Sequence, residues 1–143
     1  MYARIYVGCS LTNAPESFDV EVEALKGQLR QAGHEVLEFF GRSPGDPRDV
    51  YKTDIHDRVA KCEMSLAVCD WPSIGLGWEL GTAVEKYRKP TLAVAKRTSV
   101  VTRFVFGAEC ELNLNFQFRR YDDMSEIVLM VASFLEEMKP QFV

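Results

Sequence analysis

One carboxylate in this chain stands out for its surroundings. Glu79 lies in residues 72–83, P-S-I-G-L-G-W-E-L-G-T-A, directly after an apolar run at residues 64–69. The sequence predicts that this run is a strand buried on both faces of a sheet, and that residues 70–73 end it. A glycine-rich turn is then expected to open a helix that carries Glu79 in its first turns. In open α/β sheets ligands bind beyond the carboxyl ends of the strands, so we expect the site there.

A carboxylate at this place suits chemistry at a sugar carbon. Near a helix N-terminus, the partial positive charge and the spare backbone donors favour the ionised form. An ionised carboxylate can attack an anomeric carbon and stabilise its oxocarbenium-like transition state, while a second acid protonates the departing base. Residue types alone leave another interpretation open, in which Glu79 only stabilises its own helix or forms a salt bridge.

Other familiar motifs do not fit the sequence. The order G-L-G-W-E-L-G differs from the dinucleotide-binding pattern G-x-G-x-x-G, and the phosphate-loop pattern G-x-x-x-x-G-K-[ST] is absent. The four cysteines show no C-x-x-C spacing, and the two histidines, His34 and His56, lie far apart. We therefore predict no metal site and no cofactor, and interpret the cysteines as reduced thiols of a cytoplasmic protein.

Composition narrows the class of protein. A chain of 143 residues with 47% hydrophobic and 27% charged residues is typical of one globular domain, here residues 1–143. A net charge of −4 without a long basic run argues against nucleic-acid binding. The chain has no apolar run long enough to span a membrane and no signal-peptide pattern. The expected partner is therefore a small molecule.

Strand and helix patterns alternate along the chain. This alternation predicts an α/β fold with a five-stranded parallel sheet covered by helices. Asp49 is expected to cap the second helix. The loop at residues 41–49, which precedes that helix, is interpreted as either a lid or a solvated connector. The strand patterns cover residues 4–7, 35–40, 64–69, 91–95 and 116–121, and the helical patterns cover residues 17–32, 50–61, 77–87, 100–106 and 122–138.

Residues 72–83 resemble the signature of the nucleoside 2-deoxyribosyltransferase superfamily, and are closest in pattern to its deoxynucleoside 5'-monophosphate N-glycosidases. Weaker likeness extends over residues 5–10, the region of Asp54, and residues 100–108 and 118–123. The resemblance implies a flavodoxin-like (Rossmann-like) parallel sheet, a homodimer or higher homo-oligomer, and Glu79 as a nucleophile on the deoxyribose.

The resemblance also implies roles for other residues. Asp54 matches the acid/base aspartate, but its distance from the central strand is one residue longer than is usual in the family, so Asp57 stays an alternative. The remaining matches imply substrate contacts by Tyr6, Gly8, Ser10, Ser73, Gly75, Gly77 and, from a neighbouring subunit, Thr102.

Three positions bear on the substrate. Ser73 stands where the transferases have an Asp and the glycosidases a Ser, because a hydroxyl and backbone N–H groups can bind a phosphate that a carboxylate repels. Thr102 matches a glycosidase hydroxyl residue in the same way. Thr12, however, stands where the glycosidases carry a phosphate-binding Arg, and only Arg42, Arg48 or Arg103 could replace that charge.

Hydrolysis is the favoured hypothesis. Glu79 would attack C1', Asp54 or Asp57 would protonate the leaving base, and water would resolve the glycosyl-enzyme. A transferase would pass the sugar to a second nucleobase instead. A non-catalytic nucleotide-binding module and an NAD-cleaving enzyme are further alternatives. The base, the type of sugar and the need for a 5'-phosphate stay open.

Overall fold

The computed structural model describes residues 1–38, 46–111 and 115–142. It contains a five-stranded sheet in the order β2-β1-β3-β4-β5, with every neighbouring pair parallel. This is the flavodoxin-like α/β fold, so the predicted fold class is confirmed. The strands are β1 (Arg4–Cys9), β2 (Glu35–Leu37), β3 (Met64–Val68), β4 (Thr91–Lys96) and β5 (Phe116–Tyr121).

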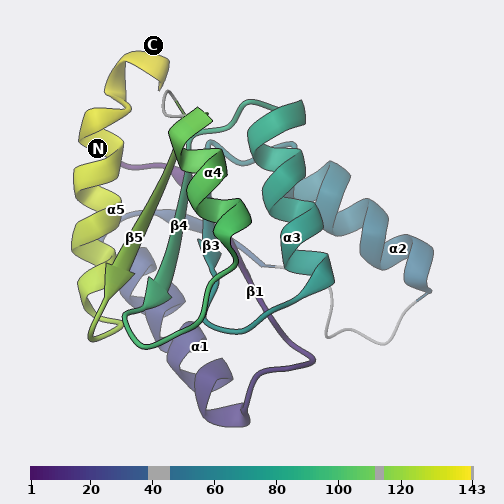
Figure 1. Ribbon diagram of the computed structural model, residues 1–143. Coiled ribbons are helices and arrows are strands. Elements are labelled where there is room, and N and C mark those ends of the chain that lie inside the picture. The colour runs from purple at the N-terminus through teal and green to yellow at the C-terminus, as the bar shows by residue number, and fades with distance from the viewer. Residues whose placement is uncertain (39–45, 112–114, 143) are drawn as a thin grey trace.

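Helices cover both faces of the sheet (Figure 1). Helices α1 and α5 pack on one face, and η1, α3, η2 and α4 pack on the opposite face. None of the helices in the described part of the chain has the length and apolar character needed to cross a membrane. The helices are α1 (Glu16–Gln31), α2 (Pro47–Tyr51), η1 (Lys52–Val59), α3 (Ile74–Gly81), η2 (Thr82–Lys86), α4 (Arg103–Glu111), α5 (Glu126–Glu137) and η3 (Lys139–Phe142).

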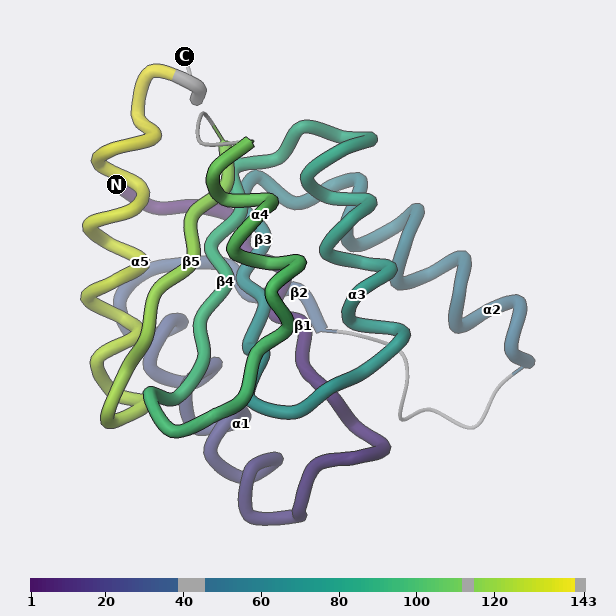
Figure 2. The backbone as a smooth tube through the Cα atoms, in the orientation of Figure 1, coloured from purple at the N-terminus to yellow at the C-terminus, as the bar shows by residue number. Residues whose placement is uncertain are grey.

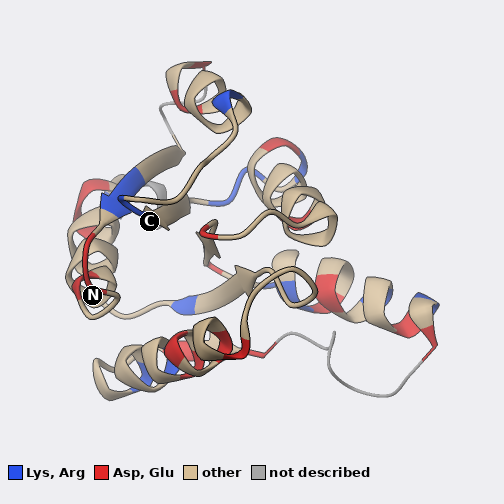
Figure 3. Ribbon diagram, turned by 60° about the horizontal axis from the view of Figure 1, so that its bottom comes forward, with Lys and Arg blue, Asp and Glu red and all other residues tan. Residues whose placement is uncertain are grey.

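The core follows the sequence patterns. All five residues of β3 are buried, as expected for a central strand that is covered on both faces. The apolar positions of α1, spaced three and four residues apart, are likewise buried against the sheet. Lys, Arg, Asp and Glu lie mainly on the helices and loops, whereas the central strands are largely uncharged (Figure 3).

Several predicted helix starts are wrong. The last helix is expected to begin at residue 122, but α5 begins at Glu126. The second helix is capped by Asp46, whose Oδ1 accepts the N–H of Arg48 at 2.8 Å, and not by Asp49. Pro47 fixes this start, because its ring favours the first helical position. The helix predicted at residues 100–106 is α4, which begins only at Arg103. Residues 39–45, with Arg42, the end of the predicted second strand and most of the suggested lid, lie outside the described residues.

The glycine-rich segment before Glu79 is helix and not turn. Ser73 is the N-cap of α3, and its Oγ accepts the N–H of Leu76 at 3.2 Å. Three glycines predicted to form the turn or follow it, Gly75, Gly77 and Gly81, are therefore residues of α3. Glu79 lies in the second turn of this helix, beyond the residues whose N–H groups lack a partner within the helix.

Because the strands are parallel, their following loops gather at one edge of the sheet. The connections that leave β1, β3 and β4 run along this edge (Figure 2). Ser10 Oγ and Asn13 Nδ2 both donate to the carbonyl of Pro72, at 3.3 and 3.1 Å, and join the first two of these loops. At the edge where the site is predicted, the loops after β1 and β3 are therefore joined to each other.

Candidate active site

Glu79 and Asp54 line one cleft, with a volume of about 350 Å³. Its walls come from the loop after β1, from the helix pair α2 and η1, and from α3. Ser73 and Gly75, at the start of α3, line the same cleft. The fold thus brings together four predicted site residues that are up to 25 positions apart in the chain, since residues 54 and 79 belong to different helices.

Two residues of strand β1, Tyr6 and Gly8, lie against the Glu79 carboxylate. The Tyr6 hydroxyl donates a hydrogen bond to Glu79 Oε2 at 2.9 Å, and the Tyr6 side chain is buried. A Cβ added to Gly8 would lie 2.9 Å from the same Oε2 and 3.0 Å from Cδ1 of Leu76. Any side chain at position 8 would therefore displace the Glu79 carboxylate. Tyr6 and Gly8 support Glu79 and do not line the cleft themselves.

The pKa of Glu79 is higher than expected for a carboxylate near a helix N-terminus. Burial raises its pKa to about 7, the hydrogen bond from Tyr6 acts in the opposite direction, and the charge of Asp54 raises it further. The prediction that a helix N-terminus favours the ionised form is therefore wrong, because Glu79 lies in the second turn and is largely desolvated. Burial, followed by the charges of Glu79 and Asp54, raises the pKa of the Tyr6 hydroxyl, which keeps its proton for the hydrogen bond.

The geometry distinguishes Asp54 from Asp57. Asp54 is buried and lines the cleft, whereas Asp57 does not line it and pairs with Lys61 Nζ at 3.6 Å. Both belong to η1, where the N–H of Ala60 donates to the carbonyl of Ile55 at 3.0 Å, five residues earlier. Such a π turn holds one residue more than an α turn, and it lies between Asp54 and the central strand β3.

Three predicted contact residues lie elsewhere. The Ser10 hydroxyl is buried against Pro72 and does not line the cleft. Gly77 and Thr102 line a separate, mostly apolar groove of about 200 Å³ between α3 and α4. Thr102 Oγ1 accepts the N–H of Phe104 at 3.3 Å, at the start of α4. Within one chain, none of these three residues lines the cleft that holds Glu79.

An aromatic wall was missed in the sequence. Tyr51 and Trp78 line the cleft, with ring centroids 6.1 Å apart and ring planes at 88°. Their side chains are 47% and 59% exposed, although large apolar rings are usually covered. Tyr51 lies three residues before Asp54, and Trp78 directly precedes Glu79. This closeness to the two carboxylates is the sequence signal by which the rings could have been found. Because the two ring planes are nearly perpendicular, one ring can stack on the face of a base while the other contacts its edge.

Positive charge does not line the cleft in the described part of the chain. Thr12 is in the lining, but Arg48 and Arg103 are not, and Arg42 is outside the described residues. Donors for an anion come instead from Ser73 and from the N-terminal amides of α3. Within residues 1–38, 46–111 and 115–142, no three His, Cys, Asp or Glu side chains are grouped as a metal site requires.

Comparisons with known proteins find a solved structure with a similar fold. No family model matches the chain, and no curated protein matches it in sequence. Among solved structures, the chain is similar to the CMP N-glycosidase BcmB of Clostridium botulinum, with 20% sequence identity and a TM-score of 0.71. The match covers 92% of this chain and 99% of that one. The protein therefore shares its fold with this solved structure over nearly its whole length.

Proposed function

We propose that this protein hydrolyses the N-glycosidic bond of a nucleoside, a deoxynucleoside or a 5'-monophosphate of either. One observation carries the proposal: two carboxylates, Glu79 and Asp54, face one cleft, and Tyr6 donates a hydrogen bond to the first of them. Paired carboxylates are the usual apparatus for breaking glycosidic bonds. The likeness of the fold to a CMP N-glycosidase adds support.

The hydrogen bond from Tyr6 assigns the roles. Two carboxyl groups that interact in a buried site share one proton over a range of pH. The Tyr6 hydroxyl stabilises the charged form of Glu79, which supports Glu79 as the nucleophile. We assign the general acid to Asp54, because it lines the same cleft and Asp57 does not.

The proposed reaction has two steps. Glu79 forms a bond to C1' while the bond from C1' to the base nitrogen breaks and Asp54 gives its proton to the leaving base. The Asp54 carboxylate then takes a proton from water, whose oxygen attacks C1' and releases Glu79. One of the rings Tyr51 and Trp78 would stack on the base and the other would contact its edge, and Ser73 with the amides of α3 would bind the 5' end of the sugar.

Release of free base is the direct test. Ribo- and deoxynucleosides, each with and without a 5'-phosphate, are incubated with the protein and analysed by chromatography, in parallel with Glu79→Gln and Asp54→Asn. We expect base release by the wild type and a loss of several orders of magnitude in both variants. Ligand binding without any base release would identify a non-catalytic binding module. Transfer of the sugar to an added second base would identify a transferase.

A covalent intermediate tests the role of Glu79 separately. Fluorine at C2' slows both steps, because it destabilises a positively charged transition state, and a substrate that also carries a good leaving base keeps the first step faster than the second. We expect the intact mass of the protein to rise by the mass of the sugar, and peptide mapping to place the adduct on Glu79. An adduct on Asp54 would reverse the assignment of the two roles.

We also propose that the protein forms a homodimer through the face between α3 and α4. Phe104 is 83% exposed and lines the apolar groove that holds Thr102, while Ile74 and Val100, near the starts of α3 and α4, are 89% and 92% exposed. Contiguous exposed apolar side chains mark interaction surfaces. A second copy would bury them and bring Thr102 near another chain.

A cytoplasmic location is part of the proposal as well. The cysteines, Cys9, Cys62, Cys69 and Cys110, all belong to the described residues, and none of them forms a disulfide. Burial raises the pKa of Cys62 to about 11 and that of Cys69 to about 12, so both stay protonated thiols. Reduced thiols of this kind are typical of a reducing compartment.

A further inference from the structure

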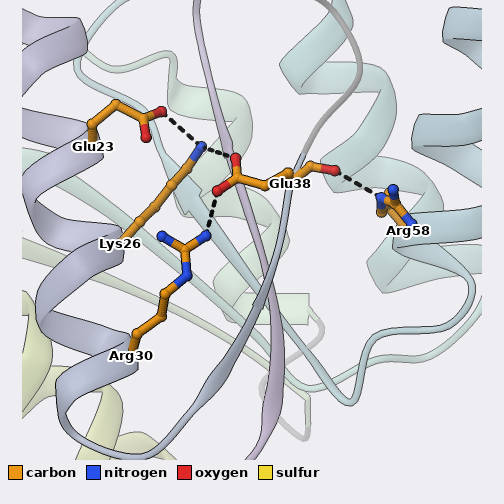
Figure 4. Close-up of polar contacts among 5 residues, drawn as sticks. All are labelled: Glu23, Lys26, Arg30, Glu38 and Arg58. Atoms are coloured by element: carbon orange, nitrogen blue, oxygen red, sulfur yellow. Dashed lines mark hydrogen bonds and ion pairs between the residues drawn. The ribbon is translucent and has the colours of Figure 1, made fainter.

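Glu38, the last residue described after β2, is the meeting point of three cationic side chains (Figure 4). Lys26 Nζ donates to its Oε2 at 3.0 Å, and Arg30 donates to its Oε1. Both cations belong to α1. From the opposite side, Arg58 Nε donates to the backbone carbonyl of Glu38 at 2.7 Å. Glu38 thus connects α1 with η1, the helix that carries Asp54.

Two ion pairs anchor Glu38 to α1. The side chain of Lys26 has no exposed surface, and its ammonium group also pairs with Glu23 at 3.0 Å. Burial acts to raise the pKa of Glu38, but the hydrogen bonds from Arg30 and Lys26 outweigh it and hold that pKa below its usual value. The carboxylate therefore stays ionised at neutral pH and remains paired. Helix α1 itself is fixed by a row of buried apolar side chains.

Helix η1, in contrast, depends on neighbours for its orientation. Its π turns depart from the regular α-helical hydrogen-bond pattern. Ile55 and Val59 bury its inner face, and Val59 packs in a cluster with Tyr6. Apolar contacts fix how deeply a helix packs, but they are not directional, whereas a hydrogen bond is. Rotation of η1 about its own axis decides whether Asp54 faces Glu79, and Arg58 lies four residues, about one turn, after Asp54.

We propose that Arg58 is a positioning residue: by donating to the carbonyl of Glu38, which Lys26 and Arg30 anchor on α1, it sets the rotation of η1 that directs Asp54 toward Glu79. The role in catalysis rests on the proposed function, whereas the placement of Asp54 does not. Arg58 itself touches no substrate, because it is not among the residues that line the cleft.

The test compares Arg58→Ala with a matched control on the same helix end. Lys61→Ala removes the pair with Asp57 and leaves the contact to Glu38 intact. We expect Arg58→Ala to lower kcat by about 10- to 100-fold at nearly unchanged KM, because a misplaced acid acts on the transition state and not on binding. Arg58→Lys, which keeps a donor, recovers part of this loss, and Lys61→Ala behaves as the wild type.

A second measurement does not need activity. The groups that face Glu79 are Tyr6 from β1 and Asp54 from η1, and the Asp54 charge contributes to its raised pKa. In protein labelled with ¹³C at the carboxyl groups of Asp and Glu, Arg58→Ala is expected to titrate Glu79 at a lower pH than the wild type. An unchanged titration together with wild-type kcat, or equal losses in Lys61→Ala, overturns the proposal. Wild-type protein that releases no base refutes the proposed function instead, and the titration still decides the role of Arg58.

Discussion

Replacement of Glu79 by glutamine is expected to stabilise the folded protein in alkaline solution while it abolishes base release. The folded protein raises the pKa of Glu79 from 4.5 to about 7, chiefly by burial. A tenfold change in proton affinity corresponds to about 1.4 kcal/mol, so keeping this carboxylate ionised costs the folded state about 3 kcal/mol. Glutamine fills the same space, accepts from Tyr6 through its carbonyl and carries no charge.

The sign follows from proton binding. Between pH 4.5 and about 7 the folded protein holds the Glu79 proton more tightly than the unfolded chain does, so the free energy of unfolding falls as the pH rises. The full penalty is present above about pH 7, and none is present below pH 4.5. Glu79→Gln escapes this penalty, so its advantage over the wild type grows from nearly zero in acid to about 3 kcal/mol at about pH 8.

Equilibrium unfolding in urea at a series of pH values measures this difference. Asp57→Asn is the matched control, because it also removes a carboxylate, but an exposed one that pairs with Lys61 outside the cleft. We expect no gain that depends on pH in the control. A Glu79→Gln variant that is less stable than the wild type at pH 8, or whose advantage is the same at every pH, would refute the assignment of Glu79 as a buried carboxylate with a raised pKa.

Three further predictions concern activity and assembly. The rate of base release is expected to rise with pH up to about 7, because the nucleophile Glu79 must be ionised and its pKa is raised to about 7; a rate already at its maximum at pH 5 would contradict this. Gly8→Ala is expected to lower kcat by about 100-fold in a protein with a native circular dichroism spectrum, because the new Cβ displaces Glu79 Oε2; wild-type kcat in this variant would contradict the described contact. Phe104→Glu is expected to convert dimer to monomer in sedimentation velocity without loss of folding, since the side chain is 83% exposed within one chain, and an unchanged dimer would place the interface elsewhere.

Much of the fold could be predicted because its signals are short in range. The uncharged run that becomes β3 and the spacing of buried residues in α1 reflect the preferences of neighbouring residues, and both elements formed where expected. The helix boundaries were harder. Asp46 and Asp49 are both good caps, and Pro47 decided between them. The π turns of η1 left no trace in the periodicity, because one additional residue in a turn does not change the types of the residues around it.

By itself, the sequence determined the alternation of strands and helices, and it singled out Glu79 through the residues next to it. Only the tertiary structure decided which aspartate faces Glu79, how Tyr6 and Gly8 support it, and that its pKa is raised to about 7. The physical reason is that apolar periodicity and chain-breaking residues act over a few positions. Desolvation and hydrogen bonding, in contrast, depend on packing between segments such as β1 and α3, whose contacting residues Tyr6 and Glu79 are 73 positions apart.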